Sequence, residues 1–192
     1  MSYPSTTSDT NHGSWPRVTA LMRDMGYYRD YHNVDPKHAR RGRLVHAGCH
    51  ILAAKTDIFG YDAWIERNEK EHNIQLRPYL EGMQKFLREH DWKLTGSEIE
   101  VINNNDRYVG HADELGYLDG VLALTDIKTG AIIPKCTALQ LAFYAKPINI
   151  QTRYCLHLPG DGTYKLQPYT SWRDFDAVTR LAGAWWDARS YR

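Results

Sequence analysis

Two periodicities divide the 192-residue chain into helical and strand-like segments. Apolar residues that recur every three or four positions predict amphipathic helices, and alternating apolar and polar residues predict strands. We therefore expect helices over residues 15–26, 37–56, 76–90, 137–146 and 172–189. We expect strands over residues 92–104, 107–118 and 120–129, and a hairpin over residues 152–170. This order of helices, a three-strand meander, a helix, a hairpin and a last helix predicts a mixed α/β fold.

The composition is that of an ordinary globular domain, with 42% hydrophobic and 24% charged residues. We expect one domain over residues 15–192, preceded by a flexible polar tail over residues 1–14. The net charge of +1 excludes a protein that coats nucleic acid by charge alone. A locally basic face remains compatible with that net charge.

Three widely separated cysteines, Cys49, Cys136 and Cys155, do not suggest a disulfide framework. They indicate a reducing environment such as the cytoplasm. The first residues lack the apolar core of a signal peptide, and no apolar run approaches the roughly 20 residues of a membrane span. We therefore expect no membrane partner.

The meander places two aspartates where their side chains are expected to meet. If Asp119 and Gly120 form a two-residue hairpin turn, Asp113 lies opposite Asp126, with Cβ atoms about 4.5–5.5 Å apart. Two ionised carboxylates at that separation repel each other, and Lys128 on the same strand face as Asp126 offsets only one charge. A divalent cation held by oxygen ligands would offset the rest. One alternative is a surface hairpin with a different turn, which would scatter these residues. A separate alternative for Lys128 is a simple salt bridge to Asp126 or Asp113.

Five short motifs occur in an order that resembles the PD-(D/E)XK nuclease superfamily, in its RecB-like and phage-exonuclease branch. They are "GHAD" at 110–113, "DIKTG" at 126–130, "LQLAFY" at 139–144, "RGRLVH" at 41–46 with its glycine and histidine, and the glutamate of "GSEIEV" at 96–101. The resemblance implies a restriction-endonuclease-like core, a central mixed β-sheet flanked by helices.

The resemblance also implies a metal site that holds Mg²⁺ or Mn²⁺. Asp113 and Asp126 are expected as carboxylate ligands, His46 as a nitrogen ligand and Ile127 as a ligand through its carbonyl oxygen. Glu98 is expected to bind a second metal or a metal-bound water, although the nearby Glu100 remains an alternative. Lys128 is expected beside the attacking water, so the catalytic set is Lys128, Asp113, Asp126 and Glu98. No iron–sulfur cluster is expected, because three cysteines without cluster spacing are too few.

Four further side chains are expected to contact the substrate. Gln140 and Tyr144 share a helix face, where ordinary packing is the alternative. Arg41 and Arg43 lie just before His46 and are expected to bind phosphate, although a solvated helix start is equally compatible. Two competing roles stay open for neighbouring residues. His46 and His50 at i, i+4 could bind zinc, and Tyr27, Tyr28 and Tyr31 could stack on unpaired bases.

The resemblance implies a metal-dependent DNA nuclease, most simply an exonuclease that leaves 5′-phosphates in phage-type DNA recombination or repair. DNA is the expected partner, and a recombination protein is a further candidate. Two alternatives remain from the residues alone. One is a catalytically inactive DNA-binding protein that keeps the nuclease architecture, and the other is a sequence-specific endonuclease of the same superfamily.

Overall fold

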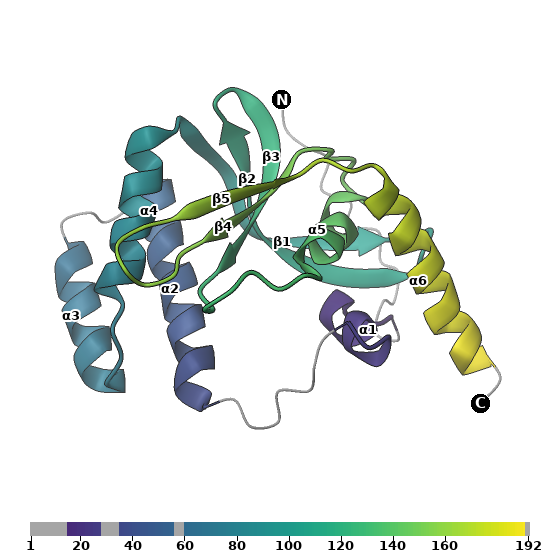
Figure 1. Cartoon of the computed structure of the whole chain (residues 1–192), viewed down its shortest axis with the longest axis horizontal. Coiled ribbons are helices and arrows are strands. Elements are labelled where there is room, and N and C mark those ends of the chain that lie inside the picture. The colour runs from purple at the N-terminus through teal and green to yellow at the C-terminus, as the bar shows by residue number, and fades with distance from the viewer. Residues whose placement is uncertain (1–14, 28–34, 56–59, 191–192) are drawn as a thin grey trace.

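A computed structural model describes residues 15–27, 35–55 and 60–190, and the expected tail over residues 1–14 lies outside these ranges. Six helices and five strands occur in the described residues (Figure 1). In chain order they are α1 (Val18–Asp24), α2 (Pro36–Ala54), α3 (Tyr61–His72), α4 (Arg77–Glu89), β1 (Trp92–Asn103), β2 (Tyr108–Leu118), β3 (Val121–Lys128), α5 (Thr137–Ala145), β4 (Arg153–His157), β5 (Lys165–Tyr169) and α6 (Arg173–Ser190).

The strands form one mixed sheet in the order β1-β2-β3-β4-β5. Neighbouring strands are antiparallel except for β3 and β4, which run parallel. A parallel pair needs a crossover connection, and α5 supplies it between β3 and β4. The expected α/β fold with a central mixed sheet flanked by helices is therefore confirmed.

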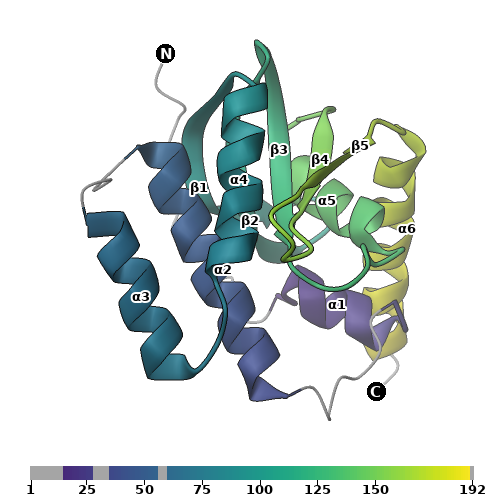
Figure 2. The same cartoon turned by 60° about the vertical axis from the view of Figure 1, so that its left-hand side comes forward.

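Helices cover both faces of the sheet, and each face has its own apolar core (Figure 2). On one face α1, α5 and α6 bury side chains such as Leu21, Phe143 and Val178. On the other face α2, α3 and α4 bury side chains such as Val45 and Met83. The β3 strand is buried on both faces, as its continuous apolar run predicts. Within the described residues no helix has the length and apolar character needed to cross a membrane.

Sequence reasoning missed one helix, α3. Its sequence, "YDAWIERNEKEH", is mostly charged and buries only Tyr61, Ile65 and Asn68. So few apolar positions give a weak helical period, and the helix forms because Ile65 packs in the core shared with α2 and α4. The other expected helices and strands are all present, with ends that differ by a few residues.

The expected β2–β3 hairpin register is confirmed. Asp119 and Gly120 both have a positive φ, at 49° and 84°, as a two-residue hairpin turn of the favoured type requires. Five residue pairs follow in the expected register, from Leu118↔Val121 to Glu114↔Thr125. The pairing ends there, immediately before Asp113 and Asp126, so the expected direct pair of these two aspartates is not part of the ladder.

The end of the sheet next to α6 is fixed by a fully buried arginine. Arg153 begins β4, and its Nη2 donates to Asp174 Oδ2 at 3.1 Å and to the Ser171 carbonyl at 2.8 Å. Its guanidinium carbon also lies 4.7 Å from the centre of the Phe175 ring. Burial lowers the pKa of Arg153, and Asp174 opposes that shift. The charge pair therefore holds the first turn of α6 against β4.

Replacing Asp174 by Asn is expected to lower the free energy of unfolding by about 1.5–3 kcal/mol, because the buried guanidinium of Arg153 loses its opposite charge. Asp176→Asn is the matched control, since Asp176 lies in the same first turn of α6 but is exposed. That change removes only its interaction with the helix dipole, worth at most about 1 kcal/mol. Urea unfolding of both variants measures the difference, and equal losses would contradict the role given to Asp174.

Candidate metal and catalytic site

The candidate site lies where β2 and β3 separate. Beyond the pair Glu114↔Thr125, the Asp113 side chain replaces main-chain pairing, since its Oδ2 accepts the Ile127 backbone N–H at 2.7 Å. The carboxylate thus occupies the gap between the two strands. It is mostly buried, with 15% of the side chain exposed.

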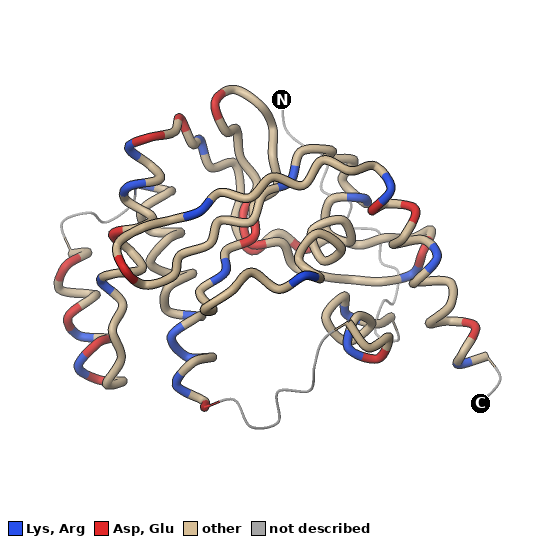
Figure 3. Tube along the Cα trace, in the orientation of Figure 1, with Lys and Arg blue, Asp and Glu red and all other residues tan. Residues whose placement is uncertain are grey.

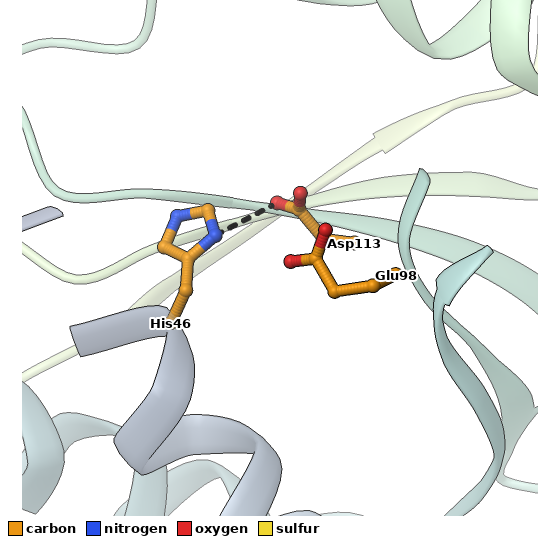
Figure 4. Close-up of side chains that lie close together, drawn as sticks. All are labelled: His46, Glu98 and Asp113. Carbon is orange, nitrogen blue, oxygen red and sulfur yellow. Dashed lines mark ion pairs between the residues drawn. The ribbon is translucent and has the colours of Figure 1, made fainter. Parts of the chain in front are cut away.

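Three possible metal ligands converge on this gap from three different elements (Figure 4). His46 comes from α2, Glu98 from β1 and Asp113 from β2, and one ligand atom of each lies within 4.8 Å of the others. His46 Nδ1 lies 3.5 Å from Asp113 Oδ2. This is the one group of three or more such side chains found among the described residues.

Glu98 reaches this group through an unusual backbone conformation. Its φ of 49° is in the left-handed region, which is uncommon for a residue with a side chain and costs roughly 1–3 kcal/mol. Its neighbours Ser97 and Ile99 keep their pairing with β2. Strain of this kind persists where the surroundings impose it, and here it sets the direction of a candidate ligand. Glu100, the alternative ligand, is exposed, pairs with His111 and lies outside the group.

The electrostatics of the group favour a bound cation. Burial and the nearby Asp126 carboxylate raise the pKa of Asp113 well above its ordinary value, whereas Lys128 and the Ile127 N–H oppose the shift. Burial is also the largest effect on His46 and lowers its pKa, which keeps the imidazole neutral and able to donate its lone pair. A carboxylate that is costly to ionise beside a neutral imidazole is stabilised by a divalent ion.

One nitrogen and two carboxylate donors suit Mn²⁺ at least as well as Mg²⁺. Opposite ligands of such an octahedral ion lie about 4.2 Å apart, from bonds of about 2.1 Å. Adjacent ligands lie about 3.0 Å apart. The three atoms lie within 4.8 Å of one another, so their side chains would move closer together to bind one ion.

Asp126 is placed differently from Asp113. It is 2% exposed, and Lys128 Nζ donates to its Oδ1 at 3.0 Å and lies 2.7 Å from its Oδ2. Asp126 does not belong to the group of three, but its negative charge acts to raise the pKa of Asp113 and that of His46. Its role as a ligand, and that of the Ile127 carbonyl, stay predictions.

The lysine is oriented by a chain of hydrogen bonds from α5. Lys128 Nζ donates to Gln140 Oε1 at 3.1 Å, and Gln140 Nε2 donates to the Tyr144 hydroxyl at 3.0 Å. Gln140 and Tyr144 are both buried, so this face of α5 is turned toward the sheet. The motif residue Gly110 makes room for the tyrosine, because a Cβ there would lie 2.7 Å from the Tyr144 ring.

The structure separates the two arginines expected to bind phosphate. Arg41 is half-buried, with its guanidinium carbon 5.0 Å from the centre of the Tyr79 ring, whereas Arg43 is exposed. His50 points to Glu114 at 3.8 Å, and it belongs to no group of three ligands among the described residues. Of the three tyrosines, Tyr27 is exposed, and Tyr28 and Tyr31 lie outside the described ranges.

Sequence reasoning missed Glu114, which is fully buried directly beside Asp113. Burial and then Asp113 raise the pKa of Glu114 to about 8. In sequence, Glu114 follows the motif without a signal of its own, and only the packing of α2 on β2 reveals its burial.

No family model matches the chain, and no curated protein matches it. Solved structures similar to it include an alkaline exonuclease from Laribacter hongkongensis, at 12% identity and a TM-score of 0.44 over 73% of this chain and 85% of that one. The same exonuclease in complex with dAMP gives 12% identity and a TM-score of 0.45 over 91% of this chain and 87% of that one. A protein named SSO0001 gives 15% identity and a TM-score of 0.39 over 90% and 84%. These values are low, and no function follows from them.

Glu98→Gln is expected to weaken Mn²⁺ binding by about tenfold or more, because a charged ligand becomes a neutral amide. Glu100→Gln is the matched control, because Glu100 lies two residues along the same strand and is also exposed to solvent. It should bind Mn²⁺ as the wild type does. Isothermal titration with Mn²⁺ measures both, and a loss confined to the Glu100 variant would reassign the ligand.

Gly110→Ala is expected to displace the Tyr144 ring and to cost about 1–3 kcal/mol of unfolding free energy through overpacking. Gly96→Ala in β1 is the control, since a Cβ there meets Ile99 at an ordinary 3.4 Å. Urea unfolding compares the two alanine variants. An undisturbed Gly110 variant would show that Tyr144 is not held by close contact with this strand.

Proposed function

We propose that this protein is a metal-dependent nuclease that hydrolyses phosphodiester bonds in DNA. The observation that carries the proposal is the position of the Lys128 amine, which Asp126 and Gln140 hold beside the gap where His46, Glu98 and Asp113 converge. A cation site with an adjacent, fixed ammonium group suits the stabilisation of charge on a phosphate undergoing attack.

Each part of the arrangement has a defined task in this proposal. A Mg²⁺ or Mn²⁺ ion would polarise the phosphate and lower the pKa of a bound water. Asp113, His46 and Glu98 would hold that ion, with Asp126 and the Ile127 carbonyl as further candidate ligands. Lys128 would position the attacking water and stabilise negative charge that develops on the phosphate oxygens.

Gln140 and Tyr144 act on the lysine. The Gln140 carbonyl oxygen accepts from Lys128 Nζ and therefore fixes the direction of the ammonium group, while Tyr144 fixes the Gln140 amide. Such support keeps a catalytic group in one rotamer, which lowers the entropy cost of the reaction. Their proposed role is thus to orient Lys128 and the substrate beside it.

Charge around the site also suits a polyanionic substrate. The first turns of α2 carry Lys37, Arg40, Arg41 and Arg43. Figure 3 shows basic segments along this part of α2 and a group of acidic segments at the centre of the sheet, with other acidic segments spread over the helices and turns. Basic side chains beside an acidic cation site can bind the phosphates that flank the one under attack. The finer assignment, an exonuclease that leaves 5′-phosphates in phage-type recombination or repair in the cytoplasm, rests on the resemblance of the motifs.

Lys128→Ala is expected to lower the rate constant for DNA cleavage by about 10²–10³-fold, because a preorganised positive group is lost. Mn²⁺ affinity should not fall, since Lys128 is not a ligand. Lys165→Ala is the control, an exposed lysine on β5 that is expected to leave cleavage unchanged. The assay follows labelled single- and double-stranded linear DNA and circular DNA with Mn²⁺, Mg²⁺ or EDTA.

Full activity in a folded Lys128→Ala protein would reject the catalytic role. DNA binding by the wild type without cleavage in either metal would favour the inactive DNA-binding protein. Discrete fragments from circular DNA would favour the sequence-specific endonuclease, and loss of label from linear ends alone would favour the exonuclease.

A further inference from the structure

A cavity of about 720 Å³ opens between the first half of α2 and the loop that follows β3. Its wall includes Tyr79, Ile132, Pro134 and Pro159, together with the cationic side chain of Arg41. A volume of this size is in the range of pockets that hold one drug-sized molecule. Most of the wall is apolar, so the cavity suits a flat, weakly polar group better than a chain of phosphates.

The cavity adjoins the candidate catalytic site. Thr129 and Gly130 line it and directly follow Lys128 in sequence. The Gly130 carbonyl lies 2.7 Å from His157 Nε2, which ties this loop to the end of β4. On the other side α2 approaches closely, since a Cβ at Gly42 would lie 3.6 Å from Thr129 Oγ1. A molecule in the cavity therefore lies beside the segment that carries Lys128.

Two features of the wall call for a ligand with an aromatic face. Ile132 is 77% exposed, the largest exposed fraction among the large hydrophobic residues described. Arg41 lies against the Tyr79 ring, and its Nε is buried without a hydrogen-bond partner among the described residues. A planar, stacked guanidinium beside an exposed aliphatic side chain is the kind of surface on which nucleobases stack.

A second, smaller cavity of about 240 Å³ shares His38, Arg41 and Tyr79 with the first one. It adds Lys37 and Gln75, with Asp35 as its one acidic lining residue. Its donors suit an anion, whereas the larger cavity suits an apolar ring. The two cavities together match the two halves of a nucleotide, a base and a phosphate.

We propose, on the basis of the nuclease function proposed above, that the larger cavity holds one unpaired base of the DNA strand being cut. The base lies against Ile132 and the Arg41–Tyr79 pair, and the phosphate of that nucleotide contacts Arg41, Lys37 and His38. In a duplex, neighbouring bases cover both faces of each base, so a base can enter only from an unpaired segment or a frayed end. The substrate class is therefore single-stranded DNA or a strand end that opens.

The test compares two fluorescently labelled strands of six nucleotides in EDTA, where no metal is present for cleavage. One strand carries thymine at every position, and the other is abasic throughout, so the two have equal charge. Base stacking should make wild-type protein bind the thymine strand about 5–150-fold more tightly, the fold-change that corresponds to roughly 1–3 kcal/mol. Fluorescence anisotropy measures both affinities, and their ratio reports contact with the bases alone.

Ile132→Ser should reduce this ratio at least threefold, because it removes the aliphatic wall without adding charge. Val121→Ser is the matched control, another exposed β-branched residue, at the β2–β3 turn, and it should keep the wild-type ratio. Arg41→Gln should weaken the binding of both strands. A wild-type ratio near one, or an unchanged ratio in Ile132→Ser, would overturn the proposal.

Adding Mn²⁺ to the same wild-type samples tests the nuclease function separately. Cleavage together with a ratio near one rejects the base cavity and leaves the nuclease proposal intact. A high ratio that depends on Ile132, without cleavage of any DNA, supports the cavity as a binding site for an unpaired base and rejects the nuclease proposal.

Discussion

The site depends on one constraint, the placement of the Asp113 carboxylate in the gap between β2 and β3. The Asp113 side chain accepts a hydrogen bond from the Ile127 N–H, a backbone donor that strand pairing would otherwise satisfy. It does so at the point where the β2–β3 pairing ends. The same carboxylate is close to His46 and Glu98, and the negative charge of Asp126 helps to raise its pKa. The Asp113 carboxylate thus both accepts a structural hydrogen bond and is a candidate metal ligand. The hydrogen bond from Ile127 therefore fixes the direction in which this candidate ligand points.

Around this carboxylate the charges are divided between two sets of residues. Asp126 is neutralised within the chain by Lys128, whose position Gln140 also fixes. Burial, and then the nearby Asp126 carboxylate, raise the pKa of Asp113, so a divalent ion suits its surroundings. Two aspartates from adjacent strands can therefore be buried together, because one is paired with an amine and the other is available for a cation.

The hairpin and the sheet could be predicted from sequence because their signals are local. Asp119 and Gly120 specify the turn, and the turn sets the register that brings Asp113 and Asp126 to the end of pairing. The choice of Glu98 over Glu100 could not be made from alternation, since both share a strand face and only the positive φ of Glu98 distinguishes them. The α3 helix, the buried Glu114 and the cavity beside Arg41 arise from contacts between distant segments, which periodicity does not encode.

The contacts of the site differ in how far apart their residues lie along the chain, and this separation affects the order in which they can form during folding. Asp126, Lys128, Gln140 and Tyr144 belong to one strand–helix unit whose contacts are short in sequence, so they can form early in folding. His46 and Asp113 come from more distant parts of the chain, so their contact closes a longer loop. In a newly made chain the amine can therefore take its place before His46 and Asp113, two candidate ion ligands, come together.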